Sequence, residues 1–113
     1  MNHEESKIQA AIVSALSLLG IFLFAVGNDF AGATSAAKAG RLKAMGLRPG
    51  VSDLVIIGRD GKGYFLEIKT ATGVLSSSQK NFRDLCSLRA WPYAIARSVD
   101  EAIDQCKKWD LTK

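Results

Sequence analysis

The N-terminal part of the chain carries apolar residues at three- and four-residue spacings, which is the pattern of an amphipathic helix. We predict a helix over residues 4–19, with one apolar stripe made of Ile8, Ile12, Leu16 and Leu19. Gly20 interrupts the apolar run. The stretch that follows, Ile21 to Val26, is rich in branched and aromatic residues and predicts a short strand.

An Asp60-Gly61 pair lies between two apolar runs and predicts a β-hairpin. Side chains two apart on a strand share a face, so Glu67 and Lys69 point the same way and Ile68 faces the opposite side. A plain two-residue turn would set Asp53 opposite Ile68, whereas one bulged residue would set it opposite Glu67 or Lys69. Both registers are compatible with the sequence.

The rest of the pattern predicts helices and one more strand around this hairpin. The expected elements are a helix from near Ser35 to Met45, a helix capped by Ser76, Ser77 or Ser78 that ends near Arg89, a strand from Tyr93 to Arg97, and a helix from Ser98 or Asp100 toward Trp109. This order predicts an α/β fold with a central mixed sheet flanked by helices. We expect residues 1–113 to form a single domain.

The net charge of +4 suits a polyanionic partner, and its distribution is more informative than its size. Four basic residues and no acidic residue lie between Phe30 and Ser52, namely Lys38, Arg41, Lys43 and Arg48. Such a segment could neutralise several phosphates of DNA in a largely sequence-independent way. The alternative is an ordinary solvated helix face.

Asp53, Glu67 and Lys69 are the candidate chemical groups. Carboxylate oxygens suit Mg²⁺ or Mn²⁺, and such an ion polarises a phosphoryl oxygen and acidifies a bound water. A neighbouring lysine can take the proton of that water or offset developing charge in the transition state. The alternative is that Glu67 and Lys69 form an exposed same-face ion pair worth under about 1 kcal/mol.

Read together, these segments resemble the VRR-NUC family, a branch of the PD-(D/E)XK nuclease superfamily. The resemblance runs from Glu5 to about Ala102, and its most specific segments are Lys43 to Leu54 (KAMGLRPGVSDL), Phe65 to Thr70 (FLEIKT) and Leu75 to Gln79. The family usually has proline before the metal-binding aspartate, and here that position is Ser52. We expect this departure to loosen the loop without changing the catalytic chemistry.

The resemblance implies a restriction-endonuclease-like PD-(D/E)XK core and a set of site residues. It makes Asp53 and Glu67 metal ligands, the Ile68 carbonyl a further ligand, and Lys69 the catalytic lysine. Gln79 and Glu5 match the glutamine and the first-helix glutamate of the family. On local pattern alone, Glu5 could equally complete a capping box with Asn2.

The activity implied by the resemblance is hydrolysis of DNA by a Mg²⁺- or Mn²⁺-dependent endonuclease, leaving a 5′-phosphate and a 3′-hydroxyl. Stand-alone members of the family are similar to Holliday-junction resolvases, so we expect a homodimer that cuts branched DNA in replication, recombination or repair. The expected location is the cytoplasm of a bacterial or phage-infected cell. The Gly/Ala-rich segment 27–40 is a candidate lid over the DNA.

Two other classes of function remain open. One is a non-catalytic DNA-binding module of the same fold. The other is a membrane-associated protein, because Ala10 to Gly27 contains no charged residue and approaches the length of a membrane span. Glu4 and Glu5 before this run and Gly20 within it favour a core helix and a strand instead.

Overall fold

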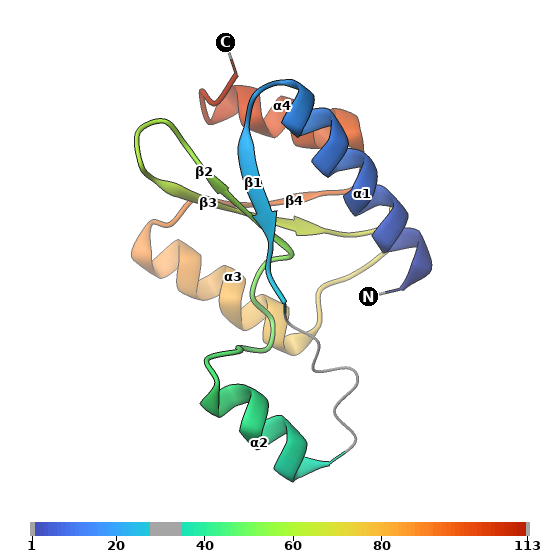
Figure 1. Ribbon diagram of the computed structural model, residues 1–113, viewed down its shortest axis with the longest axis vertical. Coiled ribbons are helices and arrows are strands. Elements are labelled where there is room, and N and C mark those ends of the chain that lie inside the picture. Colours follow the sequence, from blue (N-terminus) through green and yellow to red (C-terminus); the bar gives the residue numbers. More distant parts are fainter. Residues whose placement is uncertain (1, 28–34, 113) are drawn as a thin grey trace.

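The computed structural model describes residues 2–27 and 35–112 (Figure 1). The helices are α1 (His3–Leu18), α2 (Ala36–Ala44), α3 (Ser77–Arg89) and α4 (Val99–Lys108). The strands are β1 (Phe22–Ala25), β2 (Leu54–Ile57), β3 (Gly63–Ile68) and β4 (Tyr93–Ala96). The helices and strands expected from the sequence pattern are therefore confirmed.

The strands form one mixed sheet in the order β1-β2-β3-β4. β2 pairs antiparallel with both β1 and β3, whereas β3 and β4 are parallel. The parallel pairing sets Ala96, at the end of β4, beside Ile68, at the end of β3. The ends of β1, β3 and β4 and the start of β2 therefore meet at one end of the sheet.

The main core lies between the sheet and the helices α1 and α4, which pack against each other over one face (Figure 1). Its fully buried members include Ile12, Leu16, Leu54, Ile56, Leu66, Ile68, Ala102 and Cys106. Helix α3 covers β3 and β4 on the opposite face, where the rings of Phe65 and Phe82 meet edge-on with centroids 5.4 Å apart. The sheet is thus flanked by helices on both faces, as expected.

The apolar stripe expected on α1 is only partly buried. Ile12 and Leu16 are fully buried and Ile8 is half-buried, but Leu19 is 46 % exposed. Because α1 ends at Leu18, Leu19 is its C-cap, and Gly20 adopts a left-handed φ of 79° that leads the chain into the sheet. The buried stripe is therefore shorter than the periodicity predicts.

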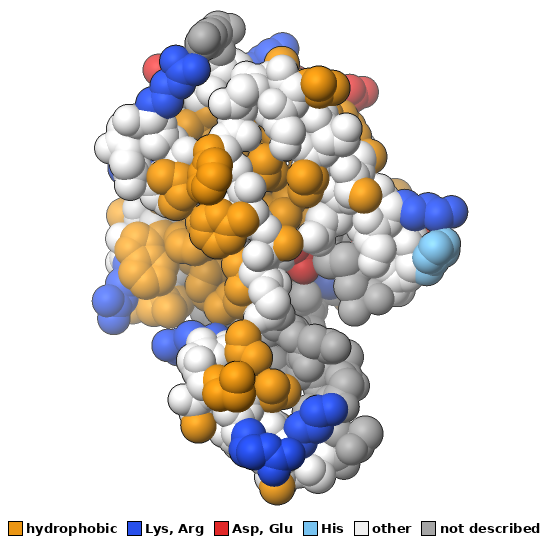
Figure 2. Space-filling view, in the orientation of Figure 1, with side chains coloured by type: hydrophobic (Ala, Val, Ile, Leu, Met, Phe, Trp, Pro, Cys, Tyr) orange, Lys and Arg blue, Asp and Glu red, His pale blue; other side chains and the backbone are white. Residues whose placement is uncertain are grey.

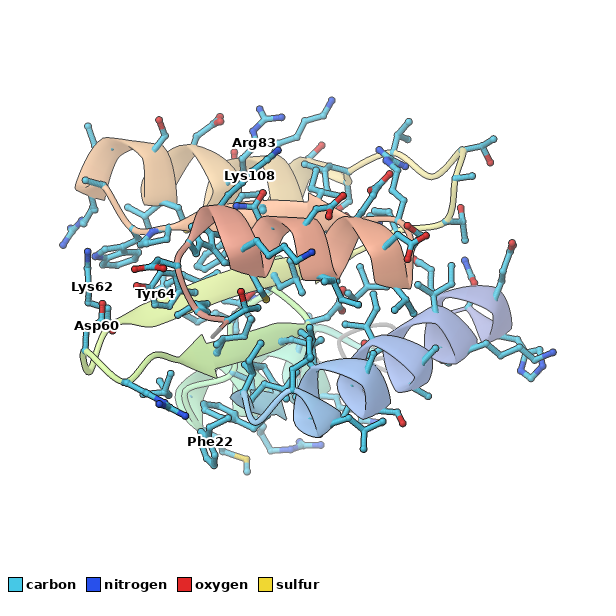
Figure 3. The ribbon with its side chains drawn as sticks, turned by 90° about the horizontal axis from the view of Figure 1, so that it is seen from above. Phe22, Asp60, Lys62, Tyr64, Arg83 and Lys108 are labelled. Carbon is cyan, nitrogen blue, oxygen red and sulfur yellow. The ribbon has the colours of Figure 1, made fainter. Side chains whose placement is uncertain are left out.

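The hairpin between β2 and β3 adopts the register that was predicted for a bulged connection, not the one predicted for a plain two-residue turn. Ile57 pairs with Gly63, so residues 58–62 form the connection, and the Gly58 N–H donates to the Lys62 carbonyl at 2.9 Å. The Tyr64 hydroxyl donates to Asp60 Oδ2 at 2.9 Å (Figure 3). Leu54 is consequently opposite Leu66, a shift of one residue from the plain turn.

Helix α2 lies apart from the sheet and its covering helices (Figure 1). Ser35 caps it by accepting a hydrogen bond from the Lys38 N–H, and none of residues 36–44 is buried. Half of the expected lid, residues 28–34, lies outside the described residues, and its C-terminal part belongs to α2.

Across residues 2–27 and 35–112, no helix is long and apolar enough to cross a membrane. The uncharged run is divided between α1, which ends at Leu18, and β1, which begins at Phe22. β1 is paired along its length with β2. This is the division into a core helix and a strand that the sequence favours.

Candidate functional site

Asp53 and Glu67 come together where β2 begins and β3 ends. The pairing of Leu54 with Leu66, continued by one residue, sets Asp53 opposite Glu67. Glu67 is 1 % exposed, whereas Asp53 is half-buried. The two predicted acidic ligands therefore lie side by side at one end of the sheet.

The backbone of Ile68 also faces Asp53. The Ile68 N–H donates to Asp53 Oδ2 at 2.8 Å. In an extended strand the N–H and C=O of one residue point toward the same neighbour, so the Ile68 carbonyl is directed to the side on which Asp53 lies. Its side chain is buried in the main core, which leaves only main-chain atoms for the site.

Glu67 is electrostatically unfavourable as an isolated carboxylate. Burial raises its pKa to about 9, and a hydrogen bond with Asp53 and the negative charge of Asp53 add to the shift, while Lys69 opposes it. Among the described residues, Glu67 Oε1 is buried without a hydrogen-bond partner. Two adjacent carboxyl groups and an unsatisfied buried oxygen thus fit a cation between them.

The available ligands are oxygen atoms, which suit Mg²⁺ or Mn²⁺. Within the described ranges, no cluster of three or more His, Cys, Asp or Glu side chains could hold a metal ion. An ion held by Asp53 and Glu67 would therefore need the main chain of Ile68, water or substrate to complete its coordination.

Gln79 is oriented toward Glu67 by the cap of α3. Ser76 is the N-cap, and it forms a capping box in which Gln79 Oε1 accepts from the Ser76 N–H at 2.8 Å. The amide nitrogen Nε2 is thereby left to donate to Glu67 Oε2 at 3.3 Å. The predicted glutamine joins the site, and it stabilises one oxygen of Glu67.

Lys69 and Glu5 face each other across the same end of the sheet. The Lys69 ammonium lies 4.0 Å from Glu5 Oε2, and both side chains are nearly buried. The Asn2 side chain caps α1 by accepting from the Glu5 N–H at 2.8 Å, so the cap uses the backbone of Glu5. The carboxylate of Glu5 is directed to Lys69 and belongs to the site region.

The four predicted DNA-contacting residues lie outside this cluster. Lys38, Arg41 and Lys43 are exposed on α2, and Arg48 is exposed on the loop that leads from α2 to Asp53. Figure 2 shows basic side chains gathered on α2, below the main body of the molecule. The basic segment directly precedes Asp53 in the chain, but α2 lies apart from the sheet that carries the carboxylate pair.

Residues 3–100 match the family model described as the VRR-NUC domain. This chain belongs to the VRR-NUC family. Its fold is similar to two solved structures named "VRR_NUC domain" and "VRR_NUC domain protein". The first has a TM-score of 0.66 and 17 % identity over 95 % of this chain and 97 % of that one. The second has a TM-score of 0.75 and 16 % identity over 100 % of this chain and 93 % of that one.

None of the curated proteins matches the sequence significantly. Membership in the VRR-NUC family gives the chain a nuclease-type fold and points to DNA as its partner. At these identities the solved structures show the fold alone. The reaction and the site residues therefore rest on the geometry described above.

Ser52 is held firmly in this VRR-NUC chain. It is 1 % exposed, and its hydroxyl donates to the Leu54 carbonyl at 3.0 Å. The family resemblance predicts that the loss of proline loosens the loop. Burial and this hydrogen bond are the contacts of Ser52 at the entry to β2, and the looser loop stays a prediction.

Two residues that support the site received no role from the sequence. Gly50 has a φ of 84°, and a Cβ at its position would collide with the carbonyl of Ser78 in the first turn of α3. Arg97 donates through Nη1 to the carbonyls of Thr70 and Gly73, both at 2.7 Å. Knowledge of the parallel pairing of β3 and β4 would have placed Arg97 next to Lys69, but the sequence pattern leaves that pairing unspecified.

Proposed function

We propose that this VRR-NUC protein is a Mg²⁺- or Mn²⁺-dependent endonuclease that hydrolyses phosphodiester bonds of DNA. The observation that carries the proposal is the meeting of Asp53 and Glu67 at the end of the sheet, with Lys69 and Gln79 beside them. These groups come from three separate segments of the chain. Such convergence of acids, a lysine and an amide is costly for stability alone, because it buries charge.

Each protein group has a distinct role in this proposal. Asp53, Glu67 and the Ile68 carbonyl would hold the ion, which supplies charge stabilisation at a phosphoryl oxygen and acidifies a water. As an ammonium, Lys69 offsets the charge that develops on the phosphate; as a neutral amine, after loss of its own proton, it takes the proton of the attacking water. Gln79 fixes Glu67, and Glu5 keeps the Lys69 ammonium in place. Attack at phosphorus then leaves a 5′-phosphate and a 3′-hydroxyl.

The basic segment binds the phosphates of DNA and takes no part in the hydrolysis itself. Lys38, Arg41, Lys43 and Arg48 present positive charge on α2 and on the loop that leads to Asp53. Phosphate contacts of this kind orient a duplex without reading its sequence. We therefore assign substrate selection to the shape of the DNA, and we propose branched DNA, such as a four-way junction, as the substrate in replication, recombination or repair.

A homodimer suits such a substrate, because a four-way junction offers two symmetry-related strands to a C2 pair of sites. An apolar strip on the edge strand β1 and its neighbour β2, made of Phe22, Phe24, Val55 and Ile57, supports this proposal. Phe22 pairs with Ile57 and Phe24 with Val55, so all four side chains share one face. Phe22 is 64 % exposed and Phe24 is 46 % exposed. A second copy of the chain could cover this strip, and Phe22→Glu should then shift the sedimentation coefficient from dimer to monomer.

A cleavage panel tests the proposed activity. The purified protein should be offered linear duplex, nicked, flap and four-way-junction DNA with Mg²⁺, Mn²⁺, Ca²⁺ or EDTA. We expect Mg²⁺ or Mn²⁺ to support cutting of the junction, with 5′-phosphate ends, and EDTA to stop it. Binding of DNA without cutting under every metal condition would instead support the alternative, a non-catalytic DNA-binding module acting in the cytoplasm of a bacterial or phage-infected cell.

A further inference from the structure

The turn that follows Lys69 is tied together by a side chain that follows β4. Arg97 Nη1 donates to the carbonyls of Thr70 and Gly73, each at 2.7 Å, and lies 3.5 Å from the Ala71 carbonyl. The Gly73 N–H closes the same turn by donating to the Thr70 carbonyl at 3.2 Å. One guanidinium nitrogen therefore holds both ends of the turn formed by residues 70–73.

This turn packs against the side chain of Lys69. A Cβ added at Gly73 would stand 3.4 Å from Lys69 Cδ and 3.0 Å from Thr70 Oγ1. The Gly73 backbone thus lies next to the aliphatic part of Lys69, while Glu5 faces its ammonium at 4.0 Å. Displacement of the turn would remove one of the two surfaces that confine the Lys69 side chain.

Arg97 is itself fixed on the main chain. It follows Ala96, whose carbonyl accepts from the Lys69 N–H at 3.1 Å, so the strand register carries Arg97 to the level of the turn. The Arg97 N–H donates to Glu101 Oε1 at 2.9 Å in the first turn of α4. The guanidinium is planar and always charged, and it offers several donors in a rigid fork, which suits adjacent carbonyls better than a lysine ammonium does.

We propose that Arg97 is a positioning residue for Lys69. By tying the carbonyls of Thr70 and Gly73, it holds the turn against Lys69 and so sets where the ammonium lies relative to Asp53 and Glu67. The consequence for catalysis rests on the proposed nuclease function. The consequence for local structure rests on the hydrogen bonds and packing of the turn alone.

The kinetic test compares Arg97→Ala and Arg97→Lys with Arg59→Ala, which removes an arginine from the distant hairpin loop. Single-turnover cleavage at saturating DNA and Mg²⁺ should fall about 10- to 100-fold in Arg97→Ala, the range expected for a misplaced catalytic group. It should fall less in Arg97→Lys and stay unchanged in Arg59→Ala. The affinity for DNA should stay within about twofold in all three, because Arg97 acts through Lys69.

A double variant separates positioning from a general structural effect. In a Lys69→Ala background, Arg97→Ala should cause no further loss of rate, because both changes remove the same contribution. Independent losses that multiply would overturn the proposal. An unchanged rate in Arg97→Ala alone would also overturn it.

Amide hydrogen exchange gives a readout that does not depend on cleavage. Exchange of residues 69–73 should speed up at least about tenfold in Arg97→Ala, with β2 unaffected, since the hydrogen bonds that hold the turn are removed. If Arg97→Ala does not fold, Arg97→Lys should show the same increase in amide exchange of residues 69–73, but a smaller one. If the wild-type protein cuts no DNA, the proposed nuclease function is wrong. If amide exchange of residues 69–73 is unchanged in both variants, the positioning role of Arg97 is wrong.

Discussion

Lys69 is held in position by three separate segments of the chain. Its N–H donates a hydrogen bond to the carbonyl of Ala96 on β4, its ammonium faces Glu5 on α1, and its aliphatic part lies beside Gly73. A surface lysine that paired with Glu67 along a strand would need none of these contacts. The near-burial of Lys69, only 9 % exposed, therefore favours a chemical role over the exposed ion pair that the sequence also allows.

Lys69→Ala should leave folding and DNA affinity nearly intact but lower the single-turnover cleavage rate by at least ~100-fold, the order expected for a proton-transfer or charge-stabilising group. Lys62→Ala, in the hairpin loop at the far end of the sheet (Figure 3), is the matched control and should cut normally. Rapid-quench cleavage with excess enzyme measures the rate. A defect confined to affinity would take Lys69 out of the chemistry.

Glu5→Gln should lower the cleavage rate less than Lys69→Ala does, because it loosens Lys69 without removing it. The cap of α1 should survive, since Asn2 bonds to the Glu5 backbone. Asn2→Ala should show the converse behaviour and lower the stability by about 0.5–2 kcal/mol with little change in rate. Thermal unfolding and cleavage assays of the two variants distinguish a capping role from a role at the site. If Glu5→Gln lowers only the melting temperature and not the cleavage rate, Glu5 does not act through Lys69.

Among the secondary-structure elements, both their order along the chain and the hairpin between β2 and β3 were predictable from the sequence. Periodicity and turn residues predicted the order of elements, and the Asp60-Gly61 pair predicted the hairpin. The register remained open by one residue, because a plain and a bulged connection suit the same residues. The connection over residues 58–62 decides it and brings Asp53 beside Glu67.

The packing of the loop before β2 against α3 was not predictable, because it joins segments far apart in the sequence. Gly50 approaches the Ser78 carbonyl and the Gln79 N–H so closely that no side chain fits. The loop that carries Asp53 and the helix turn that carries Gln79 are therefore packed directly on each other. Geometry at the site depends on this packing between elements.

Gly50→Ala should be destabilised and should also cut slowly, because the methyl group must push the loop away from the first turn of α3. Gly46→Ala is a matched control: its φ of 96° is also left-handed, but a Cβ there meets nothing within 4 Å. The control should show only the backbone cost, about 1–2 kcal/mol. Chemical denaturation and cleavage of both variants test this, and equal destabilisation of the two would argue against the close packing.

In the whole molecule, Lys38, Arg41 and Lys43 gather on α2, which stands apart from the sheet that carries Asp53 and Glu67 at one end (Figures 1 and 2). The sequence showed this group of positive charges but not its separation, because Leu42 is the one large apolar residue of α2 and does not reveal where the helix packs. The sequence also did not predict the exposed apolar strip. When both faces of a strand carry apolar residues, the pattern does not show which face a helix covers.

Replacing Lys43 and Arg48 together by alanine should weaken DNA binding about equally for all sequences. The slope of log affinity against log salt should fall by roughly one for each phosphate that the variant no longer neutralises. Single-turnover cleavage at saturating DNA should hardly change, because these side chains lie outside the carboxylate cluster. Salt-dependent fluorescence anisotropy measures the slope. A slower rate with an unchanged slope would instead move the pair into the catalytic assembly or a dimer interface.

In the proposed reaction, Asp53 and Glu67 hold a divalent ion for DNA hydrolysis. Single-turnover cleavage of a four-way junction in Mg²⁺ by wild-type protein, Asp53→Asn and Glu67→Gln tests this metal site. Each change removes a ligand's charge with little change of shape, and Glu67→Gln also removes a buried carboxylate that lacks one partner, so both variants should fold normally. We predict that the wild type cuts and that both variants are inactive at an unchanged melting temperature. Wild-type turnover by either folded variant would exclude the changed residue as a metal ligand.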